Sequence, residues 1–148
     1  MKTIVFSTLA FCIVSVFSCK KFEKTVNNTV GDNDEGTITA SIDGNSYTAP
    51  TVSAGQSNTV LFFNSSDFSN DEGLSFRIDG YDGTAKTYDF DLYNTTATYS
   101  DKSGNSHRAT SGQIIIESAG NATATGSFSF ETEDGIKVTD GHFDLNWK

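Results

Sequence analysis

Clusters of carboxylate side chains are the groups of this chain best suited to hold a metal ion. One cluster contains Asp67 and Asp71, and the next along the sequence contains Asp79 and Asp82. Such oxygen ligands suit Ca²⁺, but neither cluster has the alternating acids and closing glutamate of an EF-hand loop. Aspartate is equally typical of turns. The four aspartates are therefore candidate calcium ligands, with turn residues as the alternative interpretation.

The groups used by hydrolytic enzymes lack the spacing that catalysis requires. His107 and His142 are isolated from each other, whereas a zinc site takes several well-spaced ligands. No Gly-x-Ser-x-Gly elbow accompanies the many serines. Asp89 and Asp91 are expected roughly 6–7 Å apart on one strand face, which makes them a candidate carboxylate pair for glycoside hydrolysis, but alternating acids also mark a solvated strand face. We therefore expect no enzyme activity, no catalytic residue and no cofactor.

Three tyrosines, Tyr81, Tyr93 and Tyr99, fall in predicted loops or at outward-facing strand positions. An exposed aromatic ring with polar neighbours offers an apolar face and a polar tip to a ligand. The three are therefore candidates for a carbohydrate-binding surface. Ordinary cross-strand packing is the alternative interpretation.

The elements that would position these residues are β-strands. Apolar and polar residues alternate in segments such as 37–42 and 74–79, which is the period of a half-buried strand. The run 59–63 is almost continuously apolar and predicts a strand covered on both faces. Asp-Gly pairs, as at Asp43-Gly44, favour tight turns between the strands.

The number and spacing of these segments predict an antiparallel β-sandwich of about eight or nine short strands over 37–148, with a lipocalin-like β-barrel as the alternative. Tyr88, Phe90 and Leu92 are expected to face the same way. A long strand is expected to begin at 114–116. The connections 65–73 and 101–111 are the longest, and long loops are natural places for function.

The N-terminal segment predicts export. Lys2, the apolar run 4–17 and the small Ser18 together form the pattern of a signal peptide over 1–18. The apolar run is shorter than the roughly 20 residues that a transmembrane helix needs. Val16-Phe17-Ser18-Cys19 resembles a bacterial lipobox, after which the cysteine carries acyl chains such as palmitate. We therefore expect a lipidated Cys19 followed by a polar, flexible tether over 19–36.

The composition limits the partners. A net charge of −9 disfavours nucleic acid, whose phosphates need a basic footprint. Removal of the signal peptide takes Cys12 with it and leaves Cys19 as the remaining cysteine, so no intrachain disulfide can form. The folded part must therefore be stable through its core.

The C-terminal half carries a recurrent pattern in residues 111–116, 125–130 and 138–143. Together with Ile42-Asp43-Gly44, these segments resemble a group of small uncharacterised lipoproteins from Bacteroidota. Members combine a lipobox, a polar tether, an Ile-Asp-Gly hairpin and a finish of Gly-x-Phe-x-Phe and Thr-x-Gly-x-Phe. The resemblance implies a cell-envelope address and a fold class, and it implies no activity.

The positions shared with that group have a structural interpretation. Gly126 and Gly141 are expected at a bulge or a close approach of two backbones. Phe128, Phe130 and Phe143 are expected to anchor the core.

The combined expectation is a non-enzymatic β-domain held to the outer membrane by its lipid, on the periplasmic face or at the cell surface. Its loops would bind a partner protein or a glycan. The alternative is a lipocalin-like carrier of a small apolar ligand in the periplasm.

Overall fold

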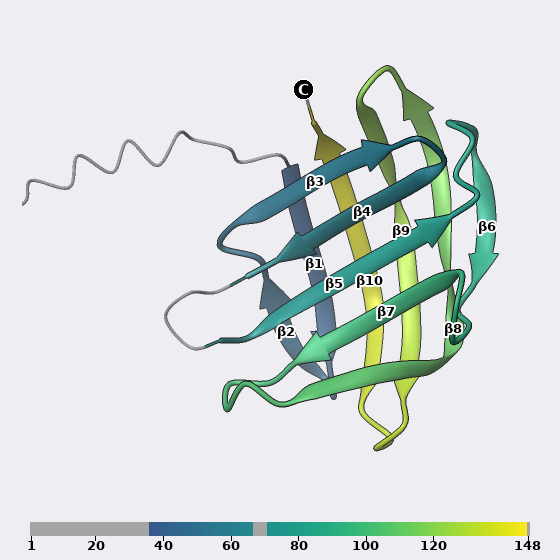
Figure 1. Ribbon diagram of the computed structural model, residues 1–148. Helices are drawn as coiled ribbons and strands as arrows, with labels where there is room; N and C mark the ends of the chain where they lie inside the picture. The colour runs from purple at the N-terminus through teal and green to yellow at the C-terminus, as the bar shows by residue number, and fades with distance from the viewer. Residues whose placement is uncertain (1–35, 67–70, 148) are drawn as a thin grey trace, which may run out of the picture. The chain divides into compact units, whose positions relative to one another are not determined.

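The computed structural model describes residues 36–66 and 71–147 (Figure 1). The predicted signal peptide, Cys19 and the tether up to residue 35 lie outside these residues, as does Asp67. Within the described ranges, no helix is long and apolar enough to cross a membrane.

Ten strands make up the described chain: β1 Gly36–Ile42, β2 Asn45–Thr48, β3 Val52–Ser57, β4 Val60–Ser65, β5 Gly73–Asp79, β6 Lys86–Asp89, β7 Thr95–Ser100, β8 Ser106–Gly120, β9 Thr123–Thr132 and β10 Lys137–Asn146. Every strand pairing is antiparallel. The prediction of an all-β antiparallel fold is confirmed.

The strands form one sheet in the order β2-β1-β10-β9-β8-β7-β5-β4-β3, and β6 also pairs with β8. In Figure 1, β3, β4, β5 and β7 run across β1, β10 and β9, so the sheet curls over itself as a half-barrel. This architecture lies between the sandwich and the barrel that the sequence suggested, because a single strand joins the two layers.

That strand is β8. Its first residues, Ser106–Arg108, pair with β7, whereas residues from Ala109 onward pair with β9. The register shifts between Ala109 and Ser111, and Gly112 follows at φ +116°. Bulges bend a strand, and this one carries β8 from one layer into the other. The predicted loop 101–111 was therefore too long: residues 106–111 belong to β8, whose polar composition concealed the strand.

Phenylalanine rings from both layers fill the interior. Phe76 lies 4.6 Å from Phe63 and 4.6 Å from Phe128, measured between ring centroids, and Phe63 lies 5.1 Å from Phe143. Each such pair stabilises the fold by about 0.5–1.5 kcal/mol beyond simple burial. The predicted core positions of Phe128, Phe130 and Phe143 are confirmed. These rings occupy the space that a lipocalin-like carrier would need for an apolar ligand.

Two predicted strand faces were wrong. In β4, Leu61 and Phe63 are buried but Phe62 is 45% exposed, so this strand is covered on one face only. Tyr88 and Phe90 are buried as expected, whereas Leu92 is 52% exposed. The alternation fails there because β6 ends at Asp89 and the chain turns.

The expected close approaches at glycine are confirmed. A Cβ atom on Gly126 would lie 1.9 Å from the carbonyl oxygen of Ile115. Gly141 follows a register shift in the β10–β9 pair, and a Cβ there would lie 2.4 Å from the ring of Phe128.

Candidate functional site

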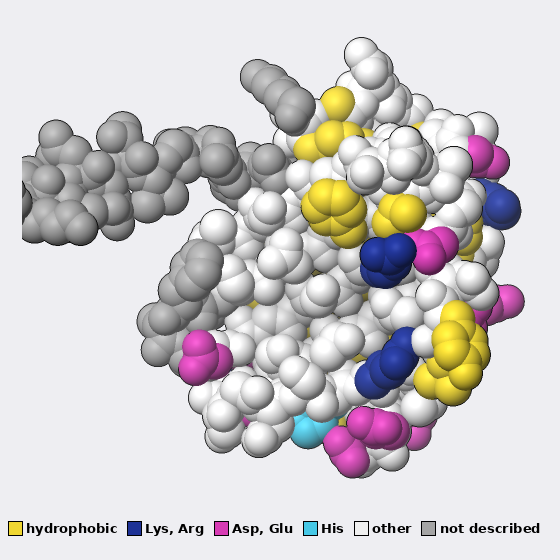
Figure 2. All heavy atoms as spheres, in the orientation of Figure 1, with side chains coloured by type: hydrophobic (Ala, Val, Ile, Leu, Met, Phe, Trp, Pro, Cys, Tyr) yellow, Lys and Arg dark blue, Asp and Glu magenta, His cyan; other side chains and the backbone are white. Residues whose placement is uncertain are grey.

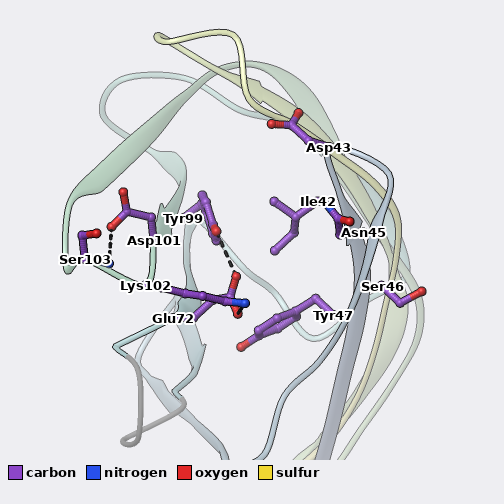
Figure 3. A pocket seen from close by; sticks show the side chains of 10 residues that line it. All are labelled: Ile42, Asp43, Asn45, Ser46, Tyr47, Glu72, Tyr99, Asp101, Lys102 and Ser103. Atoms are coloured by element: carbon purple, nitrogen blue, oxygen red, sulfur yellow. Dashed lines mark hydrogen bonds and ion pairs between the residues drawn. The ribbon is translucent and has the colours of Figure 1, made fainter.

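A cleft of about 410 Å³ opens where the β1–β2 hairpin faces the loop between β7 and β8 (Figure 3). Its lining comes from residues 42–43 and 45–47, from Glu72 just before β5, and from Tyr99 and residues 101–103. We call it the Tyr99 cleft. Its volume falls within the range of small-molecule sites, about 300–1,000 Å³.

The centre of the cleft is the carboxylate of Glu72. Glu72 Oε1 accepts a hydrogen bond from the hydroxyl of Tyr99 at 3.0 Å, and Glu72 Oε2 lies 3.7 Å from Lys102 Nζ. Figure 3 shows these three side chains converging, with that of Lys102 extending toward Tyr47. Burial, and after it the hydrogen bond to Glu72, raises the pKa of Tyr99. The phenol therefore stays protonated and keeps Glu72 in place as an acceptor.

Tyr99 occupies this position because β7 alternates. Thr95, Ala97 and Tyr99 all face inward, and only 7% of Tyr99 is exposed. Its ring stacks on that of its cross-strand partner His107, with the centroids 5.9 Å apart. The prediction that Tyr99 faces outward was wrong, although it lines the cleft.

The opposite wall is Tyr47 of β2, which is also 7% exposed. Its hydroxyl lies 2.8 Å from the hydroxyl oxygen of Ser65, which in turn accepts a hydrogen bond from the backbone N–H of Leu74 at 2.9 Å. These bonds tie β2 to β4 and β5. Both tyrosines are thus fixed before any ligand arrives, which reduces the entropy that binding would cost.

The carboxylates at the rim of the cleft accept hydrogen bonds from backbone N–H groups of nearby turns and strand ends. Asp43 Oδ1 accepts the backbone N–H of Lys137 at 2.9 Å. Asp101 Oδ1 accepts the backbone N–H groups of Ser103 and Asn105 at 2.8 and 2.9 Å. Hydrogen bonds from Asn105 are the main cause that lowers the pKa of Asp101. This carboxylate stays ionised at neutral pH and is unsuited to act as a general acid.

His107 connects the cleft to the β9–β10 turn. Its Nδ1 lies 2.7 Å from Asp134 Oδ2, and its Nε2 lies 3.4 Å from Asp101 Oδ2. The hydrogen bond with Asp134 is the main cause that raises the pKa of His107. We call this arrangement the His107 bridge. His142 is exposed on β10.

The two remaining tyrosine candidates differ in exposure. Tyr93 is 80% exposed, as expected, but it lies outside the lining of the Tyr99 cleft. Tyr81 is only 1% exposed, so its prediction as an exposed sugar platform was wrong. Its backbone N–H bonds to the carbonyl of Thr59, which turns the ring into the core.

The aspartates proposed for calcium have local partners. Asp79 Oδ1 lies 2.9 Å from Arg77 Nε, and Asp82 Oδ1 accepts the hydroxyl of Thr84 at 2.6 Å. Asp71 is exposed just before β5. Among the residues that the structure describes, no group of three or more His, Cys, Asp or Glu side chains is placed to hold a metal ion. The contact of Asp82 matches the turn interpretation that the sequence left open, whereas Asp79 ends β5 and pairs with Arg77 of the same strand.

The acids considered for glycoside hydrolysis also have a structural role. Asp91 Oδ1 accepts the backbone N–H of Tyr93 at 2.6 Å, and Asp91 Oδ2 accepts the side-chain amide of Asn94 at 2.9 Å. Hydrogen bonds from Asn94 are the main cause that lowers the pKa of Asp91 to about 2. A glycosidase acid needs the opposite shift. Asp89 is exposed at the end of β6.

The protein is an antiparallel half-barrel with a polar cleft between the β1–β2 hairpin and the loop that joins β7 to β8. The chain belongs to the family described as a domain of unknown function, DUF6252, which matches residues 34–144. That span includes every residue of the Tyr99 cleft. No curated protein and no solved structure matches the chain.

Proposed function

We propose that this chain is an exported, lipid-anchored binding module without catalytic activity, and that its Tyr99 cleft holds a carbohydrate. The observation that carries the proposal is the fixed Glu72 carboxylate, which accepts the Tyr99 hydroxyl at 3.0 Å inside a cleft of about 410 Å³. Tyr47 forms the facing wall.

A sugar suits this lining because it presents hydroxyl donors and acceptors around a partly apolar ring. The carboxylate of Glu72 can accept sugar hydroxyls, and Asn45 and Ser103 at the rim can donate or accept. The rings of Tyr47 and Tyr99 supply apolar surface. A few placed polar groups among aromatic side chains are typical of ligand sites.

Binding rather than catalysis is supported by what the carboxylates already do. Glu72 is engaged by Tyr99 and Lys102, and Asp101 holds its own turn. Acid–base catalysis needs a carboxyl group whose pKa is tuned toward the working pH. Asp101 is shifted in the opposite direction.

The anchor is supported by the sequence pattern that ends in Cys19. Each buried methylene of an acyl chain contributes about 0.8 kcal/mol, so several chains on one cysteine would hold the module permanently. The module would then sit at the outer membrane, on the periplasmic face or at the cell surface.

A glycan microarray tests the ligand. The full chain, purified in detergent and labelled, is applied to immobilised oligosaccharides, and any sugar bound is titrated by calorimetry. Glu72→Gln and Tyr99→Phe should each weaken binding by about tenfold, since the first removes the charge that strengthens hydrogen bonds from the sugar and the second removes the hydroxyl that holds Glu72 in place. Tyr93→Phe removes an exposed hydroxyl outside the cleft and serves as the matched control. Absence of any bound glycan, or equal affinities for all variants, contradicts the proposal.

Proteinase treatment of intact and lysed cells tests the anchor and its location. Cys19→Ala should release the chain from the membrane fraction, and continued attachment would contradict lipidation. Digestion in intact cells places the module at the surface, whereas protection until lysis places it in the periplasm.

A further inference from the structure

The outer face of the layer formed by β3, β4, β5 and β7 carries a second group of recognition side chains. Phe62, Arg77 and Thr96 lie opposite one another on neighbouring strands, and Thr98 and Arg108 lie opposite each other two residues further along β7. Directly paired residues project to the same side of a sheet, and so do residues two apart on one strand. We call these five residues the arginine face.

The face concentrates guanidinium groups on an acidic protein. The chain has a net charge of −9, and Arg77 and Arg108 are the arginines in its sequence. Arg77 Nε lies 2.9 Å from Asp79 Oδ1, and the Arg77 side chain is 56% exposed. Arg108 donates to the carbonyl of Leu92 and, among the residues described, forms no ion pair. Figure 2 shows basic side chains on the face turned toward the viewer, with most of the acids toward the margin of the view.

Exposed hydrophobic side chains accompany the arginines. Phe62 is 45% exposed, and a Cβ atom on Gly55 would lie 2.6 Å from its ring. The ring therefore lies against the backbone of β3, where Gly55 has no side chain to lift it. Leu92 and Tyr93 are 52% and 80% exposed, and the hydrogen bond from Arg108 holds their loop. In Figure 2, hydrophobic groups lie beside the basic ones.

We propose that the arginine face binds an acidic polysaccharide, whose carboxylates pair with Arg77 and Arg108 while a sugar ring stacks on Phe62. The planar guanidinium fork matches a carboxylate with two parallel hydrogen bonds. The two arginines stand on opposite sides of β7 and two residues out of register, which separates their Cα atoms by roughly 12 Å. A polymer with recurring carboxylates can pair one carboxylate with each arginine along the same face.

The position of the arginines favours a glycan over an acidic peptide. An extended peptide adds to an open strand edge, where main-chain groups are free. Arg77 and Arg108 stand on β5 and β8, which both have strand partners on each side. A sheet face that carries the hydroxyls of Thr96 and Thr98 and the half-exposed ring of Phe62 offers stacking and hydrogen bonds without an edge. The Tyr99 cleft contributes none of these five residues, so this site is independent of the proposed function.

The test compares two forms of one polymer: polygalacturonate and its fully methyl-esterified form, which keeps the sugar chain and removes the charge. Binding of the full chain in detergent is measured by calorimetry at about 20 and 200 mM salt. We expect the charged form to bind and the ester to fail, with affinity falling at the higher salt. Equal binding of the two forms would overturn the proposal.

Variants locate the contact. Arg77→Gln with Arg108→Gln should weaken binding to the charged polymer by about a hundredfold, which corresponds to tenfold for each lost charge-assisted pair. Lys86→Gln with Lys137→Gln removes the same charge from β6 and β10 and should leave the affinity within about threefold. If both double variants lose affinity equally, the polymer responds to the overall charge of the chain rather than to a defined site, and the proposal is overturned.

Further measurements decide the occupant and guard against misfolding. Phe62→Ala should weaken binding by about tenfold if a ring stacks there, and an unchanged affinity would remove the stacking part of the proposal. Polyglutamate that binds as tightly as polygalacturonate would overturn the choice of a glycan. Arg77→Lys with Arg108→Lys keeps the charge without the fork and should recover only part of the lost affinity. Circular dichroism confirms that each variant retains the sheet.

Discussion

Substitution of Gly126 by alanine should be among the most damaging single changes to this fold. Gly126 lies on β9, opposite Ile116 of β8 and Phe143 of β10. An added Cβ would lie 1.9 Å from the carbonyl oxygen of Ile115 and 2.5 Å from the ring of Phe143. The first neighbour is backbone, which cannot rotate away, so β8 and β9 must separate.

The cost follows from what that separation breaks. Two ladder hydrogen bonds near Gly126 would be lost or stretched, at about 1 kcal/mol net for each. Displacing the ring of Phe143 in a packed core adds about 1–3 kcal/mol. The expected loss is therefore about 3–5 kcal/mol, a large part of the roughly 5–15 kcal/mol that stabilises a typical domain.

Gly55→Ala is the matched control, since the same methyl group is added to an extended strand. The Cβ there would lie 2.6 Å from the ring of Phe62, which is 45% exposed and free to tilt. The free energy of unfolding should change by less than about 1 kcal/mol, because the unfolded state also loses entropy on this substitution. Urea unfolding followed by circular dichroism measures both variants. A loss below about 1 kcal/mol for Gly126→Ala, or equal losses for the two, would refute the steric reasoning.

Three further changes probe the bridge, a turn and the core. His107→Gln should lower the urea midpoint more at pH 5.5 than at pH 9. The His107 bridge raises the pKa of His107 from its ordinary 6.5. The bridge therefore contributes its full stabilisation, less than about 1 kcal/mol, below pH 6.5 and loses it as the pH rises through the raised pKa. Equal differences at both pH values would contradict a charged bridge. Asp91→Asn should lower the midpoint near pH 6 and lose its effect as the pH falls toward 2. The fold lowers the pKa of Asp91 from 3.8 to about 2, so the ionised carboxylate stabilises the fold fully above pH 3.8 and loses this effect as the pH falls through about 2. An effect that persists in full at pH 2 would contradict this. Phe76→Ala should cost about 3–5 kcal/mol in urea unfolding, since its ring contacts four other phenylalanines, and a cost under about 1 kcal/mol would contradict the packing described.

Local alternation was enough to predict most inward faces. Segments 37–42 and 74–79 were predicted as half-buried strands because every second residue in them is apolar, and Ile38 and Phe76 within them are buried. The start of β8 was missed because Ser106 to Arg108 are polar. The curl of the sheet was also beyond prediction, since it depends on which strand β8 pairs with at each end.

The candidate site was predicted only in part, for a similar reason. Tyr99 was singled out as an outward ring, whereas its inward position gives it a role. Glu72 and Lys102 come from two connections that were expected to carry function because of their length, and that length was the available signal. Their 3.7 Å approach joins segments about 30 residues apart, and periodicity within a strand carries no information about which strand ends meet.

The pairing of β1 with β10 places Gly36 opposite Leu145, so the first and last of the described strands in chain order are neighbours in the sheet. Contacts between distant parts of a chain make folding slow, because a long loop must close before the contact forms. β10 lies between β1 and β9, and without it two strands would present open edges of the kind that recruit other chains. During synthesis or export, the ten residues of β10 emerge after the other nine described strands. Completion of this sheet must therefore wait for β10, and a product truncated before Lys137 would be exposed to aggregation rather than merely shortened.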